Sequence, residues 1–512
     1  MKKSLSILFC SFLFSWSIAF GNGITLSNLT SVSGSGYVQL QFDLTWDNSW
    51  NNAISHDAAW VFFKFKDNDG TWRHLNLTNA NNNISSGYTI SVPSDNTGAM
   101  IYRNSGTGIV SLVGVQIGVT NLPGSFDVKG FAIEMVKLPM DDTYYVGDGQ
   151  ASNYYRNGST TASFLVNANT ITMGTAGGQL NDIVGNGTLA TGFPIGYNTA
   201  GASQNLYMLK HELSQAAYRD FLNTLTYTQQ VSRTAVLPNL AAGTLAIGTN
   251  LIYRNGIKIS TAGVASTTPA VYGCDLNNNA VYNEATDGEW GACNFLNYMD
   301  LAAFLDWAAL RPMTELEFEK SCRGPLVSVA AEYAAGTAAS ATSAFVLNNS
   351  GAANESFTYS GSVLNANITH NAASGSRITR VGIHATSGAT RISAGAGYYG
   401  VLDLSGNIPE YCVITGNVAG RSFTGVNGNG ELNSAGDADV NFWPGINGNI
   451  TVTSANTAYG GTTGVTGAAG IFTRGGGTGW TPALSQTSSR QDIPATTSTR
   501  GIQTGGRGVK SW

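Results

Sequence analysis

The sequence predicts a mainly β protein, in which an antiparallel β-sandwich precedes a loop-rich α+β domain. Three observations lead to this prediction. Apolar and polar residues alternate with period two in several runs between residues 24 and 138, helical patterns are confined to residues 205–324, and Gly, Asn, Thr and Ser dominate the remainder. With 512 residues, 42% of them hydrophobic, the chain is long enough for two or three domains with buried cores.

Residues 1–21 are predicted to be a secretory signal peptide. Lys2 and Lys3 precede an apolar stretch over residues 5–20, and small residues surround a cleavage point near Gly21. The mature chain is therefore expected to be secreted, and to lie outside the cell or at its surface. No later stretch of about 18 apolar residues follows, so no membrane span is expected.

Residues 22–140 are predicted to form the β-sandwich domain. The runs VQLQFDLTW, AWVFFKFKD, GIVSLVGVQIGV and FDVKGFAIEMVKL are separated by clusters of Gly, Asn, Asp and Pro, as in an antiparallel sandwich. Four tryptophans could form an exposed platform that stacks on sugars: Trp46, Trp50, Trp60 and Trp72. The alternating pattern favours core positions for most of them.

Residues 141–190 are interpreted as a connection that leads into the first strands of a second domain, residues 191–512. NLYMLKHELSQAAYRDFLNTL predicts a strand and then a helix that Ser214 caps, and MDLAAFLDWAAL predicts a second helix. In RPMTELEFEKSCRG, Thr314 and Glu317 form a capping box and Gly324 ends a third helix. Beyond Gly324 we expect long loops around a small sheet, because islands of aromatic residues argue against a disordered tail.

The low charge of the chain limits its partners. Charged residues make up 11% of the sequence and the net charge is −5, whereas glycine contributes 63 residues. Asn, Ser, Thr and Gly must then cover the surface, as is common in secreted proteins and cell-surface fibres. No cluster of Lys and Arg with interleaved aromatics occurs, so nucleic-acid partners are not expected. Other copies of the chain or cell-surface components are the favoured partners.

Four cysteines remain after cleavage: Cys274, Cys293, Cys322 and Cys412. An even number in an oxidising compartment favours disulfides, with three possible connectivities, and buried free thiols are the alternative. No C-x-x-C spacing occurs, so a zinc knuckle is not expected.

The loop CDLNNNAVYNEATDGEWGAC, residues 274–293, resembles a calcium loop. Oxygen-bearing side chains alternate at its start and recur near its end: Asp275, Asn277, Asn279 and Asp287, with Glu284 as an alternative to Asp287. Ala280 and Thr286 stand where an EF-hand needs Gly and Glu, so a true EF-hand is excluded. The hypothesis is a calcium-stiffened loop closed by a Cys274–Cys293 disulfide, and a plain Asx-rich turn is the alternative.

Four segments together resemble the signature segments of the formylglycine-generating enzyme (sulfatase-modifying factor) family. In order they are YMLKHELSQAAYRDFLN, RPMTELEFEKSCRG, YYGVLDLSGNIPEYC and FTRGGGTGW. The resemblance covers roughly residues 190–512 and leaves the sandwich outside. It implies a variant of the C-type lectin-like fold, with few regular elements and many loops.

The resemblance does not extend to the metal chemistry of the family. Its enzymes oxidise a sulfatase cysteine with a copper ion held by two cysteines downstream of the last segment, but residues 474–494 contain no cysteine. Copper(I) needs soft ligands, and Pro409 also replaces a family tryptophan. The five histidines include no H-x3-H pair of the kind expected for the related iron enzymes. Neither copper nor iron is expected, and no catalytic residue is assigned.

The resemblance does imply calcium. The family's turn maps onto the side chains of Asp403 and Glu410 and the carbonyl groups of Gly406 and Ile408, and hard oxygens of this kind suit Ca²⁺. The alternative is that Asp403 and Glu410 only cap turns. A second family site is matched weakly by the pair Asn367 and Ile368.

A Cys322–Cys412 disulfide completes the predicted pairing. These two cysteines remain once Cys274 pairs with Cys293, and the resemblance implies that their segments are neighbours. Such a bridge would hold the third helix to the calcium turn.

Three functions follow as hypotheses. The first is a non-catalytic secreted structural protein for adhesion, display or assembly into a fibre, in which the sandwich supplies an edge strand to its neighbour. The second is a carbohydrate-binding module that uses the loop aromatics Trp443, Tyr459 and Trp480. The third is an oxidase of the formylglycine-generating type with an altered metal site.

Overall fold

The computed structural model describes residues 18–20, 23–34, 37–120, 127–140, 143–149, 154–182, 187–189, 205–339, 345–359, 378–386, 388–440, 442–444, 469–490 and 500–512. Within these residues strands predominate over helices, and most neighbouring strands are antiparallel. The predicted mainly β class is therefore confirmed.

The first sheet lies within residues 18–119 and has the strand order β1-β2-β3-β9-β6. We keep the word sandwich as a name for the strands of residues 18–139, after the prediction. Its strands are β1 (Ile18–Phe20), β2 (Ile24–Gly34), β3 (Tyr37–Asn51), β9 (Gly106–Val119) and β6 (Leu77–Asn83). Alternate residues of β3, including Leu40, Phe42 and Leu44, are at most 1% exposed, as the period-two pattern predicts. Strand β1 lies inside the predicted signal peptide.

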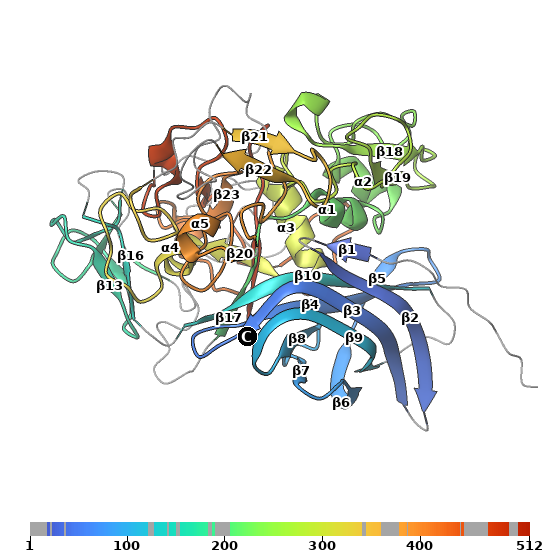
Figure 1. The fold of residues 1–512 in the computed structure, drawn as a ribbon, viewed down its shortest axis with the longest axis horizontal. Coiled ribbons are helices and arrows are strands. Elements are labelled where there is room, and N and C mark those ends of the chain that lie inside the picture. Colours follow the sequence, from blue (N-terminus) through green and yellow to red (C-terminus); the bar gives the residue numbers. More distant parts are fainter. Residues whose placement is uncertain are drawn as a thin grey trace, which may run out of the picture.

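The second sheet has ten strands and runs through both halves of the chain (Figure 1). The sandwich contributes β10 (Val128–Pro139), β4 (Asp57–Lys66), β8 (Ala99–Arg103), β7 (Tyr88–Ser91) and β5 (Trp72–Leu75). The later half contributes β17 (Asn205–Leu209), β25 (Gly508–Ser511), β20 (Arg311–Thr314), β23 (Glu410–Val413) and β24 (Ile471–Arg474). Strands β10 and β17 join the halves, with Met135 opposite Leu209 and Pro139 opposite Asn205. The ten-stranded sheet thus includes strands from both sides of the expected connection, residues 141–190.

Shorter strands form small sheets beside this frame. In the expected connection these are β11 (Tyr144–Val146) with β13 (Phe164–Val166), and the set β12 (Arg156–Asn157), β15 (Leu180–Asn181), β14 (Thr172–Met173) and β16 (Gly187–Thr188). Two hairpins follow, β18 (Ile257–Thr261) with β19 (Val271–Cys274), and β21 (Phe345–Asn348) with β22 (Ser356–Tyr359).

Local capping signals fix the helices. Helices α1 (Gln215–Leu222) and α4 (Glu315–Arg323) begin after Ser214 and Thr314, whose side chains accept backbone N–H groups as predicted, and α4 ends at Gly324. Helix α3 (Tyr298–Trp307) begins with an Asn297–Asp300 capping box. Helix α2 (Tyr227–Arg233) was not predicted, although Thr226 and Gln229 form a capping box at its start. Single-turn helices α5 (Arg391–Ala394) and α6 (Val418–Arg421) lie in the later loops.

Helices α1 and α3 pack on the ten-stranded sheet above β10 (Figure 1). Trp307 at the end of α3 is central: its ring centroid lies 5.1 Å from that of Phe62 in β4, 4.8 Å from Phe131 in β10 and 5.4 Å from Phe221 in α1. Aromatic contacts of this kind stabilise the fold beyond the effect of the buried area alone. One hydrophobic core therefore spans the sandwich and the helices.

The four sandwich tryptophans divide into two pairs. Trp46 and Trp60 are fully buried, whereas Trp50 and Trp72 are half-buried. Among the helices that the structure describes, none is both long and apolar enough to cross a membrane.

Candidate functional site

The segment over residues 398–412 forms a tight turn that ends in β23. Asp403, Gly406 and Asn407 adopt left-handed backbone conformations, with φ of 59°, 99° and 56°. Gly and Asn accept this region most readily, which explains the Ser-Gly-Asn sequence of the turn. The turn lies beside the buried guanidinium of Arg507, which contacts Glu410 and the carbonyl of Leu402.

Three buried carboxylates meet there: Glu212, Asp403 and Glu410, which we call the carboxylate cluster. Each is at most 2% exposed. The Nε atom of Arg507 lies 2.7 Å from Glu410 Oε1, and its other nitrogens donate to the carbonyl groups of Leu209 (3.0 Å) and Leu402 (2.7 Å). Arg507 thus joins β17, the turn and β23 by charge-assisted hydrogen bonds.

Backbone and amide donors satisfy most of the remaining carboxylate oxygens. Glu212 accepts from Asn407 Nδ2 at 2.7 Å and from the N–H of Ile408 at 3.0 Å. Asp403 Oδ2 accepts from the N–H of Gly382 at 2.5 Å. The carboxylates therefore hold neighbouring segments together.

Burial sets the protonation of the carboxylate cluster. It raises the pKa of Glu410 to about 7, because removal from water outweighs the attraction of Arg507, and Asp403 adds to the rise. Burial also raises the pKa of Glu212 well above its usual range, and Asp403 and Glu410 reinforce the shift. The guanidinium of Arg380 also interacts with Asp403, so the carboxylate cluster faces two cations.

The arrangement does not fit the predicted calcium site. Ca²⁺ needs six to eight oxygens, but Glu410 Oε1 faces Arg507 and Asp403 Oδ2 faces a backbone N–H. Glu410 Oε2 is buried without a hydrogen-bond partner among the described residues, and one such oxygen is too few. These contacts match the alternative in which the carboxylates hold turns. Calcium binding stays a prediction, and Asn367 and Ile368 lie outside the described residues.

The loop over residues 274–293 is stiffened by a lysine. Lys258 Nζ, buried on β18, lies 2.8 Å from Asp275 Oδ2 and 2.6 Å from Asn278 Oδ1. Its ammonium group therefore occupies the place where a metal ion would meet these oxygens. The remaining predicted ligands make short-range turns: Asn277 and Asn279 accept backbone N–H groups two residues on, and Asp287 accepts that of Glu284. The Asx-rich alternative describes this loop.

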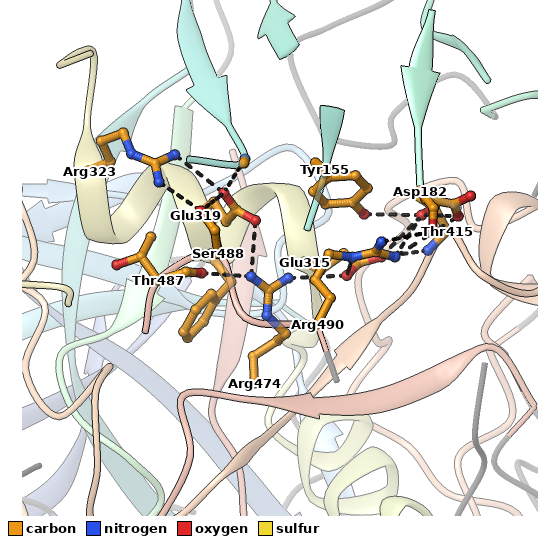
Figure 2. Close-up of polar contacts among 12 residues, drawn as sticks. Tyr155, Asp182, Glu315, Glu319, Arg323, Thr415, Arg474, Thr487, Ser488 and Arg490 are labelled. Atoms are coloured by element: carbon orange, nitrogen blue, oxygen red, sulfur yellow. Dashed lines mark hydrogen bonds and ion pairs between the residues drawn. The ribbon is translucent and has the colours of Figure 1, made fainter. Parts of the chain in front are cut away.

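A second buried charge network lies on α4 (Figure 2). Arg474 lies between Glu315 (3.1 Å) and Glu319 (3.0 Å), and Arg490 contacts Glu315 at 2.7 Å. Burial alone would raise the pKa of Glu315, but Arg490 and Arg474 outweigh it and hold the pKa at about 2. Arg474 belongs to the segment FTRGGGTGW, so this arginine is used to tie the loop to the helix.

The same network anchors the small sheets of residues 141–190. Arg490 stacks on Tyr155, with 3.9 Å between the guanidinium carbon and the ring centroid, and Thr415 Oγ1 donates to Asp182 at 2.7 Å. The N–H of Gly147 donates to Glu319 at 2.8 Å. The predicted connection is therefore part of the folded core around α4.

The four cysteines are buried and free, so neither predicted disulfide is present in the structure. Burial raises the pKa of Cys274 and of Cys322 to about 12, and it raises the pKa of Cys293 and Cys412 well above the usual range. Thiols of this kind stay protonated and pack as small apolar groups. Buried free thiols are the alternative to disulfides that the sequence allowed, and burial in the shared core accounts for them.

The predicted sugar-stacking aromatics do not share one surface. Trp443 is fully buried and its Nε1 donates to the carbonyl of Val426 at 2.8 Å, so a sugar cannot stack on it here. Trp480 is half-buried and its indole N–H donates to Gln503. Tyr459 lies outside the described residues.

Sequence reasoning missed Glu212, Lys258 and Arg507, whose roles depend on partners far away in the chain. Glu212 lies within a quoted segment, whereas Lys258 and Arg507 carry no local signal. No protein-family model matches the chain, and no curated protein matches it. The resemblance to the formylglycine-generating enzyme family therefore rests on the four quoted segments.

Proposed function

We propose that this chain is a secreted, non-catalytic surface or extracellular protein, built on a C-type lectin-like scaffold of the formylglycine-generating type. One observation carries the proposal. Five charged side chains of the quoted segments are at most 2% exposed and contact other buried side chains or the backbone: Glu212, Glu315, Asp403, Glu410 and Arg474. A catalytic group must reach its substrate, whereas these groups hold the fold.

The edge of strand β2 supports assembly of copies into a larger structure. Strand β1 pairs only with residues 24–26, and within the described chain no strand pairs with that side of residues 30–34. Residues 30–34 pair regularly with β3 on their other side. Cleavage near Gly21 would remove β1 and open the whole β2 edge, which a strand from a second copy could extend.

The opposite edge of the same sheet is protected. The pairing of β6 with β9 shifts between Thr78 and Asn83, and Asn81 is left-handed with φ of 60°. Bulges of this kind prevent a regular edge-to-edge ladder. Strand β2 has a similar shift between Ser27 and Thr30, with Asn28 left-handed at φ of 52°, but residues 30–34 beyond it pair regularly with β3. This regular part of the β2 edge is therefore the one that we assign to self-association.

Assembly of the mature protein, residues 22–512, tests the proposal. We expect species larger than a monomer by light scattering and negative-stain microscopy. Thr30→Lys places a charge on the exposed β2 edge and should reduce assembly. Thr267→Lys, the same change at an exposed turn away from this sheet, should not.

Two results would overturn the proposal. A strictly monomeric mature protein would remove the assembly function. Stoichiometric copper or iron, together with oxidation of a cysteine in a sulfatase peptide, would instead support an oxidase with an altered metal site.

A further inference from the structure

A hollow of about 440 Å³ lies where the sandwich meets the helices, away from the carboxylate cluster. Four segments line it: residues 69–73 around the start of β5, residues 224–229 between α1 and α2, Trp307 at the end of α3, and residues 430–434. We call it the Trp72 hollow. Its volume lies in the range of ligand pockets, roughly 300–1,000 Å³, and junctions between structural units are where such pockets concentrate.

Trp72 provides an aromatic wall with a fixed position. Its indole is half-buried, and the ammonium group of Lys129 lies 4.5 Å from the ring centroid. Lys129 is itself held by the carbonyl of Asn223 at 3.2 Å. A wall that is already ordered loses little conformational freedom when a ligand binds. Indoles offer the apolar face on which a sugar ring can pack through its C–H groups.

Trp307 lines the hollow and carries an unsatisfied donor. The residue is 3% exposed, and its Nε1 is buried without a hydrogen-bond partner among the described residues. A buried donor without an acceptor is costly, and the few that native proteins contain need an explanation. Trp307 therefore belongs to the packed wall of the hollow, and its buried N–H is not assigned to a ligand.

Residues 430–431, which form one wall of the hollow, are held in place by Lys64 and His74. Lys64 Nζ donates to the carbonyl of Gly430, and the N–H of His74 donates to Glu431 Oε1 at 2.5 Å. Gly430 has φ of 88°, and a Cβ atom there would meet His74 Nδ1 at 2.1 Å, so glycine is required. Glu431 Oε2 accepts no hydrogen bond from the described residues and is open to a ligand donor.

The charges of the lining select against anions. Asp69 and Glu431 line the hollow with a single cation, Arg73. Arg73 Nη2 lies 3.0 Å from Asp69 Oδ2, and its Nε lies 3.7 Å from Asp67 Oδ2. An anionic ligand would face two carboxylates and a guanidinium that is already paired. An uncharged ligand with many hydroxyl groups suits the aromatic wall and the open hydrogen-bonding groups.

We propose that the Trp72 hollow binds a neutral saccharide, with a pyranose ring against Trp72 and its hydroxyls bonded to Glu431 and Thr228. This site differs from the loop aromatics that the sequence suggested. It goes beyond the function proposed above, because binding there needs neither assembly nor the β2 edge.

Titration of the mature protein with glucose, galactose, mannose, N-acetylglucosamine and their disaccharides tests the proposal, with tryptophan fluorescence and calorimetry as readouts. We expect saturable binding of at least one neutral sugar. Trp72→Ala should weaken it at least tenfold. Thr228→Trp fills the hollow from an exposed helix position and should have the same effect without touching the core. Trp50→Ala, at the other half-buried sandwich tryptophan, is the matched control and should leave binding unchanged.

Three results would overturn the site. The first is the absence of a saturable response to any neutral sugar. The second is an unchanged affinity in Thr228→Trp, and the third is a preference for glucuronate and sugar phosphates over neutral sugars. A monomeric protein that still binds sugar would refute self-association and leave the saccharide site standing.

Discussion

At the scale of single residues, buried charges carry much of the specificity of this fold. Arg507, Arg474, Lys210 and Lys258 are each at most 3% exposed and each contacts a buried carboxylate. Burying an ion pair costs desolvation, so such pairs add little net stability. Their larger effect is that any other packing would leave a charge unpaired.

Replacement of Arg507 tests this role. Arg507→Met removes one cation from the carboxylate cluster and leaves Glu410 buried without its partner. We expect the free energy of unfolding, measured by urea denaturation, to fall by roughly 3–5 kcal/mol. Arg73→Met, at a half-exposed ion pair, is the control and should change stability little. Equal losses in both variants would contradict the assignment.

The carboxylate cluster also predicts a pH dependence. In the unfolded chain Glu410 ionises near 4.5, whereas in the fold it holds its proton to about pH 7. The raised pKa of Glu410 stabilises the fold fully below about pH 4.5. This stabilisation is lost as the pH rises through about 7, because between these two pH values only the unfolded state releases the proton. Asp306, whose pKa burial raises to about 8, acts in the same direction. Burial lowers the pKa of Lys64 to about 7. Lys64 therefore makes the fold more stable as the pH rises, but only above about pH 7.

Between pH 5 and pH 7 the buried histidines His56 and His211 act in the opposite direction, because burial lowers their pKa values to about 4 and about 3. The contribution of Glu410 is therefore tested by comparison. Relative to the non-titrating variant Glu410→Gln, the wild-type protein should lose stability from pH 5 to pH 7. Denaturation curves at several pH values measure both slopes, and parallel slopes would show that Glu410 is not responsible.

At the scale of elements, the turn over residues 398–412 and the loop over residues 274–293 are held by protein groups. Arg507 faces Glu410 in the first, and Lys258 faces Asp275 in the second. Each cation contacts one of the side chains that the sequence assigned to Ca²⁺. A lysine or arginine supplies the positive charge without the six to eight oxygens that calcium needs.

From these contacts we expect calcium at millimolar concentration, or its removal by chelator, to leave the melting temperature unchanged. Differential scanning fluorimetry with calcium and with chelator measures this. A rise with calcium that Glu410→Gln abolishes would instead support the family-type calcium site at residues 403–410.

Elements also show what local sequence could and could not predict. The capping box at Thr314 and Glu317 and the left-handed turn at Gly406 and Asn407 depend on atoms within a few residues, and both could be predicted. Helix α2 carried the same kind of signal at Thr226 and could have been found. Lys258 lies 17 residues before Asp275 and could not be paired with it from spacing.

At the scale of the whole molecule, the ten-stranded sheet makes the sandwich and the later half one unit. Strand β10 pairs with β4 on one side and with β17 on the other, and β17 then pairs with β25 near the end of the chain. Trp60 Nε1, in the sandwich, donates to the carbonyl of Ala308 at 2.9 Å. A shared sheet and core couple the stability of the two halves.

Unfolding should accordingly be a single cooperative transition. We expect calorimetry and urea denaturation of residues 22–512 to show one transition, coincident by fluorescence and circular dichroism. The isolated segment 22–140 should not fold stably, because β10 loses β17 and the core loses Trp307. Two separated transitions, or a stable isolated sandwich, would contradict this coupling.

The sequence by itself determined the four long strands β3, β4, β9 and β10 and the helices α1, α3 and α4, two of them with their caps. Each depends on periodicity or on contacts within a few residues. Only the tertiary structure decided that β10 joins β17, that Arg507 meets Glu410, that the cysteines pack as free thiols, and that Trp72 borders a hollow. These features depend on which distant segments are buried together, and the simultaneous burial of many side chains sets that choice.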